Sequence, residues 1–384
     1  MTHAITRENT FGLNVYPKRD LVLVRGENAK VWDAEGREYI DCVAGHGVAN
    51  IGHCHPEVVA AVTAQAQKLI TCPGIFYNDV RAVLLEKLVG VAPSKLQRAF
   101  LCNSGAESVE AAIKFARYVT GKHEIVCAMR GFHGRTLGAL SATFNPKYRE
   151  KFQPLVPGFH FASFNQFEKF AEKINADTAA VLLEVVQGEG GVHIGAAEFF
   201  QRVQALCREQ GVLLIIDEVQ TGFCRTGKFF ACEHFDLQPD MMCVAKAIAG
   251  GLPMGAVLCS EAIEIPESQH GATFGGSPLV CAAAIAALEV MRKENLAEQA
   301  RKKGDYFRRK LGVFELKKAR EVRQIGLMIG IELKEKVQPY ILKLIDAGIL
   351  TLPAGQTVLR LLPPLTISYA ELDVVVEKLA GVLF

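Results

Sequence analysis

Two residues that could take part in amine chemistry each follow an apolar run in the middle of the chain. Asp217 follows residues 212–216, and Lys246 follows residues 241–245. Unbroken apolar runs of this length predict strands buried on both faces, as in a parallel sheet, whose ligands bind beyond the carboxyl ends of the strands. There Asp217 could keep a proton on a pyridine nitrogen and Lys246 could form an imine with an aldehyde, as a pyridoxal phosphate site requires. These two residues alone leave other interpretations open, because an Asp-Glu pair after a strand also holds magnesium in nucleotide-binding proteins, and a lone lysine is usually solvated.

A second feature is a small polar loop between a predicted strand and a predicted helix. The strand covers residues 98–102, and the apolar residues of 107–118 recur at helical spacing. Between them lie Ser104, Gly105 and Ala106. Backbone N–H groups and the helix dipole would make this loop an anion site. The alternative is an ordinary strand–helix turn capped by Ser104.

Two further loops follow predicted strands at residues 124–129 and 179–183. In the first, Phe132 stands beside glycine, where its ring could lie flat against a planar ligand, and Arg135 offers a planar fork for a carboxylate. The second, 184–191, is rich in glycine but does not match G-x-G-x-x-G, and the chain contains no G-x-x-x-x-G-K-[ST]. Both main nucleotide-binding signatures are therefore missing.

The cluster His53-Cys54-His55 raises the question of a metal site. Its spacing matches no common zinc pattern, and a second pair of ligands is missing. We therefore expect a structural or substrate-lining turn, and no metal.

The composition favours an α/β enzyme over a nucleic-acid-binding or membrane protein. The 384 residues suffice for two domains, 50% are hydrophobic, and a net charge of +2 is too balanced for a dedicated nucleic-acid binder. The 11 cysteines form no C-x-x-C pair, which indicates reduced thiols and a cytoplasmic protein. The first ten residues have no apolar core, so no signal peptide is expected. The uncharged stretch 268–288 contains too many polar residues and glycines for a bilayer span.

Strand-like and helical runs alternate along the chain, which predicts an α/β fold. A hairpin at 21–33 and a strand at 38–41 are expected to form a small sheet before the main domain. A long alanine-rich helix, 279–292, should lead into a last domain. The elements expected in that domain are a helix at 296–311, a strand at 326–333, a helix at 338–347, a strand at 357–361 and a helix at 369–382.

The motifs, taken in order, resemble the class III aminotransferases of the fold-type I pyridoxal phosphate enzymes, in the acetylornithine and ornithine aminotransferase branch. The resemblance implies a large cofactor-binding domain at 46–283, with a mostly parallel central sheet flanked by helices. It also implies a smaller α+β domain at 284–384 and an N-terminal segment, 1–45, that packs with the small domain. Several motifs are weak singly, but the ordered series is specific. The matching segments are 52–56, 103–107, 131–136, 184–189, 217–222, 245–247, 273–276 and 360–364.

By this resemblance the cofactor is pyridoxal phosphate, and the catalytic residues are Lys246 and Asp217. Lys246 would bind the aldehyde and later move the proton of the 1,3-shift. A neutral amine is needed for base chemistry, and a cationic cofactor nearby can depress a lysine pKa. Asp217 would keep the pyridine nitrogen protonated, so that the ring accepts the electron pair of the broken C–H bond. The residues implied to contact the cofactor are Ser104, Gly105, Ala106, Phe132, Asp217, Val219, Gln220, Lys246 and Thr273.

The resemblance gives each of these contacts a role. Phe132 and Val219 would sandwich the ring, Gln220 would bond its phenolic oxygen, and the start of the helix near residue 105 would bind the phosphate. Thr273 would reach the phosphate of the neighbouring subunit, so that the active unit is a homodimer.

The residues implied to bind substrate are Arg135, Glu189 and Arg360. Arg135 would bind the α-carboxylate of the substrate. In relatives that transfer a terminal amine, a glutamate matching Glu189 masks an arginine matching Arg360 until 2-oxoglutarate arrives. The alternative for this pair is a structural ion pair.

Within the family, the segments 128–150, 326–336 and 360–364 resemble the branch that acts in lysine biosynthesis by the α-aminoadipate route. There the α-amine is blocked by a small acidic amino-group carrier protein, and the enzyme forms glutamate and the side-chain semialdehyde. The alternatives are an N-acetylornithine aminotransferase of arginine biosynthesis or another ω-amino acid aminotransferase. An aminomutase or racemase is disfavoured by the Glu189–Arg360 combination, and a non-catalytic binding protein by the presence of both Lys246 and Asp217.

Overall fold

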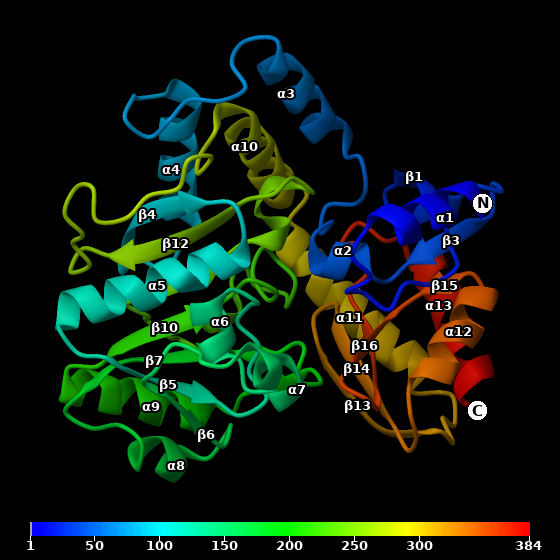
Figure 1. Cartoon of the computed structure of the whole chain (residues 1–384). Coiled ribbons are helices and arrows are strands. Elements are labelled where there is room, and N and C mark those ends of the chain that lie inside the picture. The colour runs from blue at the N-terminus through cyan, green and yellow to red at the C-terminus, as the bar shows by residue number, and fades with distance from the viewer. Residues whose placement is uncertain (1) are drawn as a thin grey trace.

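A computed structural model of the chain describes residues 2–384. Its larger part is built around a seven-stranded sheet, and the smaller part beside it holds both ends of the chain (Figure 1). The strand β12 runs antiparallel to both of its neighbours, and the other neighbouring pairs are parallel. This confirms the mostly parallel central sheet. In spatial order its strands are β4 (Leu96–Cys102), β12 (Gly255–Ser260), β11 (Met241–Val244), β10 (Leu213–Asp217), β7 (Thr178–Glu184), β5 (Glu124–Ala128) and β6 (Phe159–Ala162).

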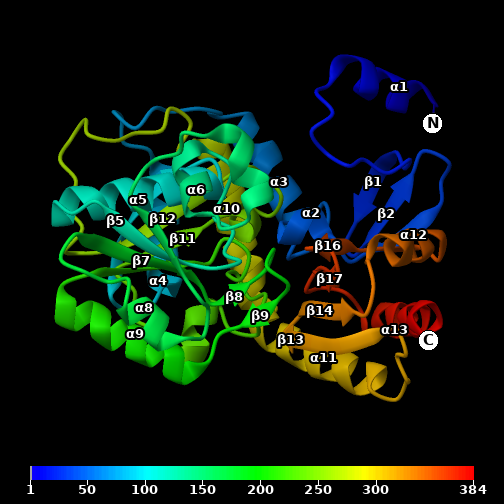
Figure 2. The same cartoon turned by 60° about the horizontal axis from the view of Figure 1, so that its bottom comes forward.

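Helices on both sides bury the central strands of this sheet. Ile215 of β10 belongs to the apolar cluster that contains α5 (Gly105–Thr120), whereas Ile216 belongs to the cluster that contains residues of α9 (Ala197–Gln210). Figure 2 shows these two helices on opposite sides of the sheet. Successive side chains of a strand point to opposite faces, so a strand covered on both sides needs an unbroken apolar run.

Two smaller four-stranded sheets form the rest of the core. β3 pairs in parallel with β15, so the N-terminal segment shares a sheet with the C-terminal part. The domain boundaries at 45/46 and 283/284 stay predictions, and α10 (Pro278–Lys293) spans the second of them. The first small sheet has the order β1 (Leu23–Glu27), β2 (Lys30–Asp33), β3 (Glu38–Asp41) and β15 (Ile349–Leu350). The second has the order β13 (Ala319–Ile325), β14 (Met328–Leu333), β17 (Val358–Leu361) and β16 (Leu352–Ala354).

The remaining elements connect and cover these sheets. Within residues 2–384, no helix is long and apolar enough to cross a membrane. The stretch 268–288 forms a loop and the first part of α10. The remaining helices and the short β8–β9 hairpin are α1 (Thr2–Phe11), α2 (Ala44–Gly47), α3 (Pro56–Ala66), α4 (Asp79–Val91), α6 (Leu137–Ala142), α7 (Pro146–Arg149), η1 (Glu150–Phe152), α8 (Phe167–Ala171), β8 (Val186–Gln187), β9 (His193–Ile194), η2 (Ala231–Phe235), η3 (Lys246–Ala249), α11 (Leu296–Leu311), α12 (Gln338–Asp346) and α13 (Tyr369–Leu383).

The histidines of the His-Cys-His cluster have structural partners. His53 Nε2 lies 2.7 Å from Asp41 Oδ2. His55 caps α3 by accepting the backbone N–H of Glu57 on its Nδ1. In the described part of the chain, no group of three or more potential metal ligands gathers here or elsewhere.

Arg225 is fully buried and forms hydrogen bonds between the two parts of the molecule. Arg225 donates from Nη1 to the carbonyl oxygens of Leu327 (3.0 Å) and Pro363 (2.6 Å). Its Nη2 donates to Asn50 Oδ1 at 2.5 Å. Burial lowers the pKa of Arg225 to about 9. Because Pro363 lies three residues after Arg360, this contact helps to fix the position of β17 against the carboxyl edge of the large sheet.

Candidate active site

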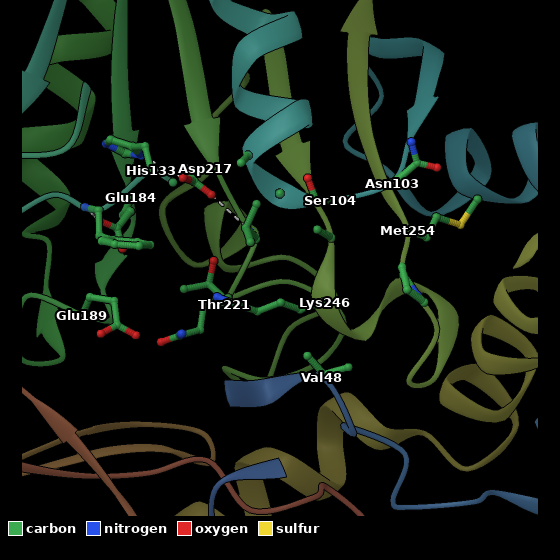
Figure 3. Close-up of a pocket in the computed structure, with 18 of the residues that line it drawn as sticks. Val48, Asn103, Ser104, His133, Glu184, Glu189, Asp217, Thr221, Lys246 and Met254 are labelled. Atoms are coloured by element: carbon green, nitrogen blue, oxygen red, sulfur yellow. Dashed lines mark hydrogen bonds and ion pairs between the residues drawn. The ribbon is translucent and has the colours of Figure 1, made fainter. Parts of the chain in front are cut away.

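A cavity of about 390 Å³ lies at the carboxyl edge of the large sheet, where the ends of several strands meet (Figure 3). Arg135, Thr273 and Arg360 are the predicted site residues that do not line it, although Arg360 bonds to two residues that do. The predicted residues that line the cavity are Ser104, Gly105, Ala106, Phe132, Glu189, Asp217, Val219, Gln220 and Lys246.

Asp217 ends β10 and is held on both carboxylate oxygens. Its Oδ2 lies 2.7 Å from His133 Nδ1, and its Oδ1 accepts the backbone N–H of Val219 at 3.0 Å. Burial disfavours the protonated imidazole, but the hydrogen bond to Asp217 and its charge outweigh burial and raise the pKa of His133. These two contacts lock the orientation of the carboxylate, as a fixed partner for a ring nitrogen requires.

Lys246 begins η3, with only Ala245 between it and the end of β11, and has a left-handed backbone, with φ of +49°. This conformation is uncommon for a residue with a side chain. The lysine extends into the same cavity as Asp217 (Figure 3). Burial is the main cause that lowers the pKa of Lys246, with Glu189 opposing and Arg360 reinforcing the shift. The amine is therefore neutral at a lower pH than an ordinary lysine, which a general base needs.

The start of α5 provides an anion-binding end to the cavity. Ser104 caps the helix by accepting the N–H of Glu107 at 3.2 Å, and Gly105 and Ala106 form the first turn. A Cβ atom added at Gly105 would lie 2.7 Å from Val219 Cγ1, so this position has no room for a side chain. The exposed N–H groups of the turn and the helix dipole favour a negative group.

A buried carboxylate braces the wall of the cavity. Glu184 Oε1 accepts the N–H of Phe132 at 2.9 Å, and its Oε2 accepts the N–H of Gly188 at 3.1 Å. Burial is the main cause that raises the pKa of Glu184 to about 7. Phe132 and Val219 both line the cavity, and the brace fixes the backbone of Phe132.

An ion pair closes one end of the cavity. Arg360 Nη2 donates to Glu189 Oε1 at 2.6 Å, and its Nη1 donates to Gln220 Oε1 at 3.0 Å. The Arg360 side chain is 1% exposed, whereas that of Glu189 is 28% exposed. Burial raises the pKa of Glu189, but the charge and hydrogen bond of Arg360 outweigh it and lower the pKa. Glu189 therefore stays charged and covers the arginine.

Besides Arg360, two predicted residues lie outside the cavity lining. Arg135 is exposed, and its guanidinium lies 3.7 Å from the ring centroid of Tyr148 and 5.3 Å from that of Phe132. Thr273 is exposed on the loop between β12 and α10. Within this single chain, neither residue contributes to the cavity lining.

The sequence motifs contained two functional side chains to which no role was assigned. His133 and Glu184 stand inside the matched segments, but their partners, 84 and 52 residues away, lie on other segments. The available signals are that His133 is directly beside Phe132 and that Glu184 is the first residue of the matched segment 184–189. Val48 and Thr221 also line the cavity without having been predicted.

The cavity fits a phosphorylated pyridine aldehyde. It combines an anion-binding helix start, a slot beside Phe132 and Val219, a fixed carboxylate and an amine of lowered pKa. A family model described as aminotransferase class-III matches residues 14–383. The chain belongs to the class III aminotransferases.

Similar proteins share nearly the whole length of the chain. A [LysW]-aminoadipate semialdehyde transaminase of Deinococcus radiodurans is 51% identical over 384 residues, covering 99% of this chain and 90% of the relative. An acetylornithine aminotransferase of Methanosarcina acetivorans is 45% identical over 376 residues, covering 98% and 95% of the two chains. The ornithine aminotransferase structure of Toxoplasma gondii ME49 has a TM-score of 0.95 and 31% identity, covering 100% of this chain and 94% of that chain.

The family also establishes the cofactor. Class III aminotransferases depend on pyridoxal phosphate, and a second structure of the Toxoplasma gondii enzyme is described with partial occupancy of PLP at its active site. This class III aminotransferase is therefore a pyridoxal phosphate-dependent enzyme.

Proposed function

We propose that this aminotransferase moves a terminal amino group from an α-amine-blocked lysine or ornithine to 2-oxoglutarate, giving a semialdehyde and glutamate. The observation that carries the proposal is the Glu189–Arg360 ion pair at the end of the cavity. While Glu189 is paired with Arg360, this end of the cavity has no free cation. The cavity then accepts a substrate side chain that ends in an amine. When Glu189 turns away, Arg360 can bind a carboxylate of 2-oxoglutarate, because a guanidinium pairs with carboxylates in a planar fork.

The residues around the cofactor have separable tasks in this proposal. When bound, pyridoxal phosphate supplies an aldehyde and a ring that withdraws electrons from the substrate carbon. Asp217, held by His133, keeps a proton at the pyridine nitrogen. Lys246 would hold the aldehyde carbon until the substrate amine displaces it and, as the released neutral amine, would then take and return the proton at the substrate carbon. The first turn of α5 binds the phosphate.

Three more contacts complete this proposed cofactor site. Phe132 and Val219 restrict the ring between them. The Gln220 oxygen accepts from Arg360, so its amide NH₂ group is the part that would donate to the phenolic oxygen. Gln220 would thus contact both the cofactor and the Glu189–Arg360 ion pair, which is the gate of the cavity in this proposal.

We further propose a carrier-linked substrate in lysine biosynthesis. The 51% identity with a [LysW]-aminoadipate semialdehyde transaminase supports this choice. Exposed Lys147 and Lys151 lie on α7 and η1, near Arg135, which stacks on Tyr148 of α7. Figure 1 shows α7 on the side of the large part that faces the smaller part. A small acidic carrier would be attracted to these cations, whereas Arg135 itself would bind the substrate α-carboxylate.

The second candidate is an N-acetylornithine aminotransferase, favoured by the 45% identity with the Methanosarcina acetivorans enzyme. The deciding experiment compares kcat/KM for carrier-linked lysine and for free N-acetylornithine at several salt concentrations. Attraction between exposed charges is screened beyond about 8 Å at physiological ionic strength. Carrier-linked turnover should be faster at low substrate and should fall more steeply with salt. Preference for N-acetylornithine, with equal salt responses, would assign the enzyme to arginine biosynthesis.

We propose that the active unit is a homodimer in which Thr273 reaches the neighbouring site. Large exposed apolar side chains gather on the loop before α4 and beside Thr273. Arg81 connects these loops by donating to the carbonyl oxygens of Cys72, Phe76 and Gly276. Covering this surface with a second copy would bury apolar area. The exposed apolar residues are Leu69, Ile70, Ile75, Phe76, Tyr77 and Phe274.

Mixed dimers test the position of Thr273. A dimer of one Lys246→Ala subunit and one Thr273→Ala subunit should contain one intact site, with normal cofactor affinity and turnover. If Thr273 served its own subunit, neither site would be intact, and no site of normal affinity would be measured.

We also propose that the enzyme works in the cytoplasm. All 11 cysteines are free thiols, and ten of them are buried. Thiols in this number are typical of a reducing compartment. Imaging of a tagged protein in its own cells would test the location, and secretion of the enzyme would contradict it.

A further inference from the structure

A second cavity, of about 610 Å³, lies between the two parts of the molecule. Arg130, two residues before Phe132, lines it together with His193 of β9 and Arg323 of β13. β9 contacts β13, and Figure 2 shows the β8–β9 hairpin beside β13 at the junction of the two parts. None of its lining residues belongs to the proposed cofactor or substrate site.

The cavity wall contains buried polar atoms that have no partner within residues 2–384. The Arg323 side chain is 9% exposed. Its Nε donates to the Gly191 carbonyl oxygen at 3.0 Å and its Nη1 donates to carboxylates, but its Nη2 has no partner. Gln187 is 1% exposed and donates to the Met129 carbonyl oxygen at 2.8 Å, while its Oε1 has no partner. An unpaired buried donor such as Nη2 favours negative charge nearby, whereas Oε1 is an acceptor and offers no hydrogen bond to a carboxylate.

The charges that line the cavity favour an anion. Glu321, the carboxylate in the lining, and Glu332 both pair with Arg323, so the charge of that arginine is already compensated. Arg130 has no ion pair among the described residues, and its Nη1 lies 3.0 Å from His193 Nε2. Burial, followed by the charges of Arg323 and Arg130, lowers the pKa of His193. A neutral His193 accepts from Arg130 and leaves the arginine charge uncompensated.

The size and lining of the cavity indicate an organic ligand. A volume of about 610 Å³ is much larger than a bare oxyanion needs, and Phe164, Ile194 and Met129 form apolar parts of the wall. We propose that this cavity is a second ligand site, which binds a small organic monocarboxylate. Its carboxylate pairs with Arg130, and its carbon body packs on the apolar wall.

The test uses the cofactor-loaded enzyme and 4-fluorobenzoate as the probe, with binding followed by fluorine NMR. Arg130→Gln removes the unpaired positive charge from the cavity lining. Gln166→Glu adds a negative charge at another position of the same lining. Arg202→Gln is the matched control, because Arg202 is an exposed arginine outside the cavity that pairs with Glu168. Thermal unfolding and turnover verify that each variant is folded.

The parent enzyme and Arg202→Gln should bind the probe saturably and equally. Arg130→Gln and Gln166→Glu should each weaken binding by about five- to ten-fold, as expected for one charged contact at a partly exposed site. Unchanged affinity in both cavity variants would overturn the proposal, because binding would then lie elsewhere, including the active site. No saturable binding to the parent, or displacement of the probe by an equal concentration of inorganic phosphate, would also overturn it.

Discussion

Replacement of Arg360 by alanine should separate the two half-reactions of the enzyme. Arg360 is 1% exposed and presents a fixed fork, with Nη1 on Gln220 and Nη2 on Glu189. Truncating one partner of a buried, hydrogen-bonded charge pair costs about 2–5 kcal/mol. A substrate carboxylate must displace Glu189 before it can bind Arg360, which reduces the net contribution of the arginine to substrate binding. We therefore take the lower half of this range. Arg360→Ala should lower kcat/KM for glutamate and for 2-oxoglutarate by about 10²-fold.

The reaction with the amine donor should suffer far less, by under about ten-fold, because no carboxylate of that donor needs Arg360. Single-turnover measurements of the cofactor absorbance, with each substrate alone, separate the two half-reactions. Glu189→Gln is the matched control: it keeps the arginine and should retain the glutamate half-reaction while slowing the donor half-reaction. Equal losses in both half-reactions of Arg360→Ala would refute the gate and indicate a structural ion pair.

The variants Arg360→Ala and Glu189→Gln should shift the pKa of Lys246 in opposite directions. Burial lowers the pKa of Lys246, Arg360 lowers it further and Glu189 raises it. Arg360→Ala should therefore raise this pKa, and Glu189→Gln should lower it. The pH dependence of the rate at which cofactor-free protein takes up pyridoxal phosphate measures the shift. Identical profiles for both variants would show that neither charge acts on the lysine.

Three further outcomes are expected. The purified protein should be yellow, with a visible absorption band that borohydride abolishes. The Lys246→Ala variant should bind the cofactor without covalent attachment. If this variant turned over at a rate comparable to the parent, the role of Lys246 would be wrong. Asp217→Asn should keep the fold and lose about 10²–10³-fold in rate or more, which steady-state kinetics will measure, and a near-normal rate would overturn the pocket assignment. Burial raises the pKa of fully buried Glu218 from 4.5 to about 7, so the stability that it contributes is present below pH 4.5 and is lost as the pH rises through 7. Unfolding curves at pH 5 and pH 8 should show a loss of at most about 3 kcal/mol in the parent that Glu218→Gln lacks, and parallel pH responses would disprove this.

The sequence predicted the parts of the site that depend on single segments. Asp217 and Lys246 were placed in one pocket because parallel strands end at the same edge of a sheet, and the structure places both in one cavity. The start of α5 was predicted from a polar loop between a strand and a helix, and Ser104 caps that helix. Each of these inferences needed only local patterns and a general rule of α/β folds.

Two of the strands at sheet edges are not predicted from the sequence, because they are only partly buried. β6 (Phe159–Ala162) and β13 (Ala319–Ile325) each lie at the edge of a sheet, and most of their residues are partly exposed. Such strands need no unbroken apolar run, so periodicity does not reveal them. The strand expected at 326–333 begins at Met328, because Gly326 forms a turn with φ of +54°. A Cβ atom at Gly326 would lie 2.5 Å from the Thr226 carbonyl carbon, a close approach between distant segments that no local pattern records.

The contacts between distant segments decide how the gate can work. Glu184 holds the backbone N–H groups of Phe132 and Gly188, so the cofactor wall and the start of the Glu189 segment share one buried brace. Two residues after Glu189, the carbonyl oxygen of Gly191 is held by buried Arg323. With the backbone fixed on both sides, the gate should open by rotation of the Glu189 side chain, which is 28% exposed. Because the Arg360 side chain is buried and has no such freedom, we expect the glutamate to be the moving half of the pair and the arginine to be its fixed support.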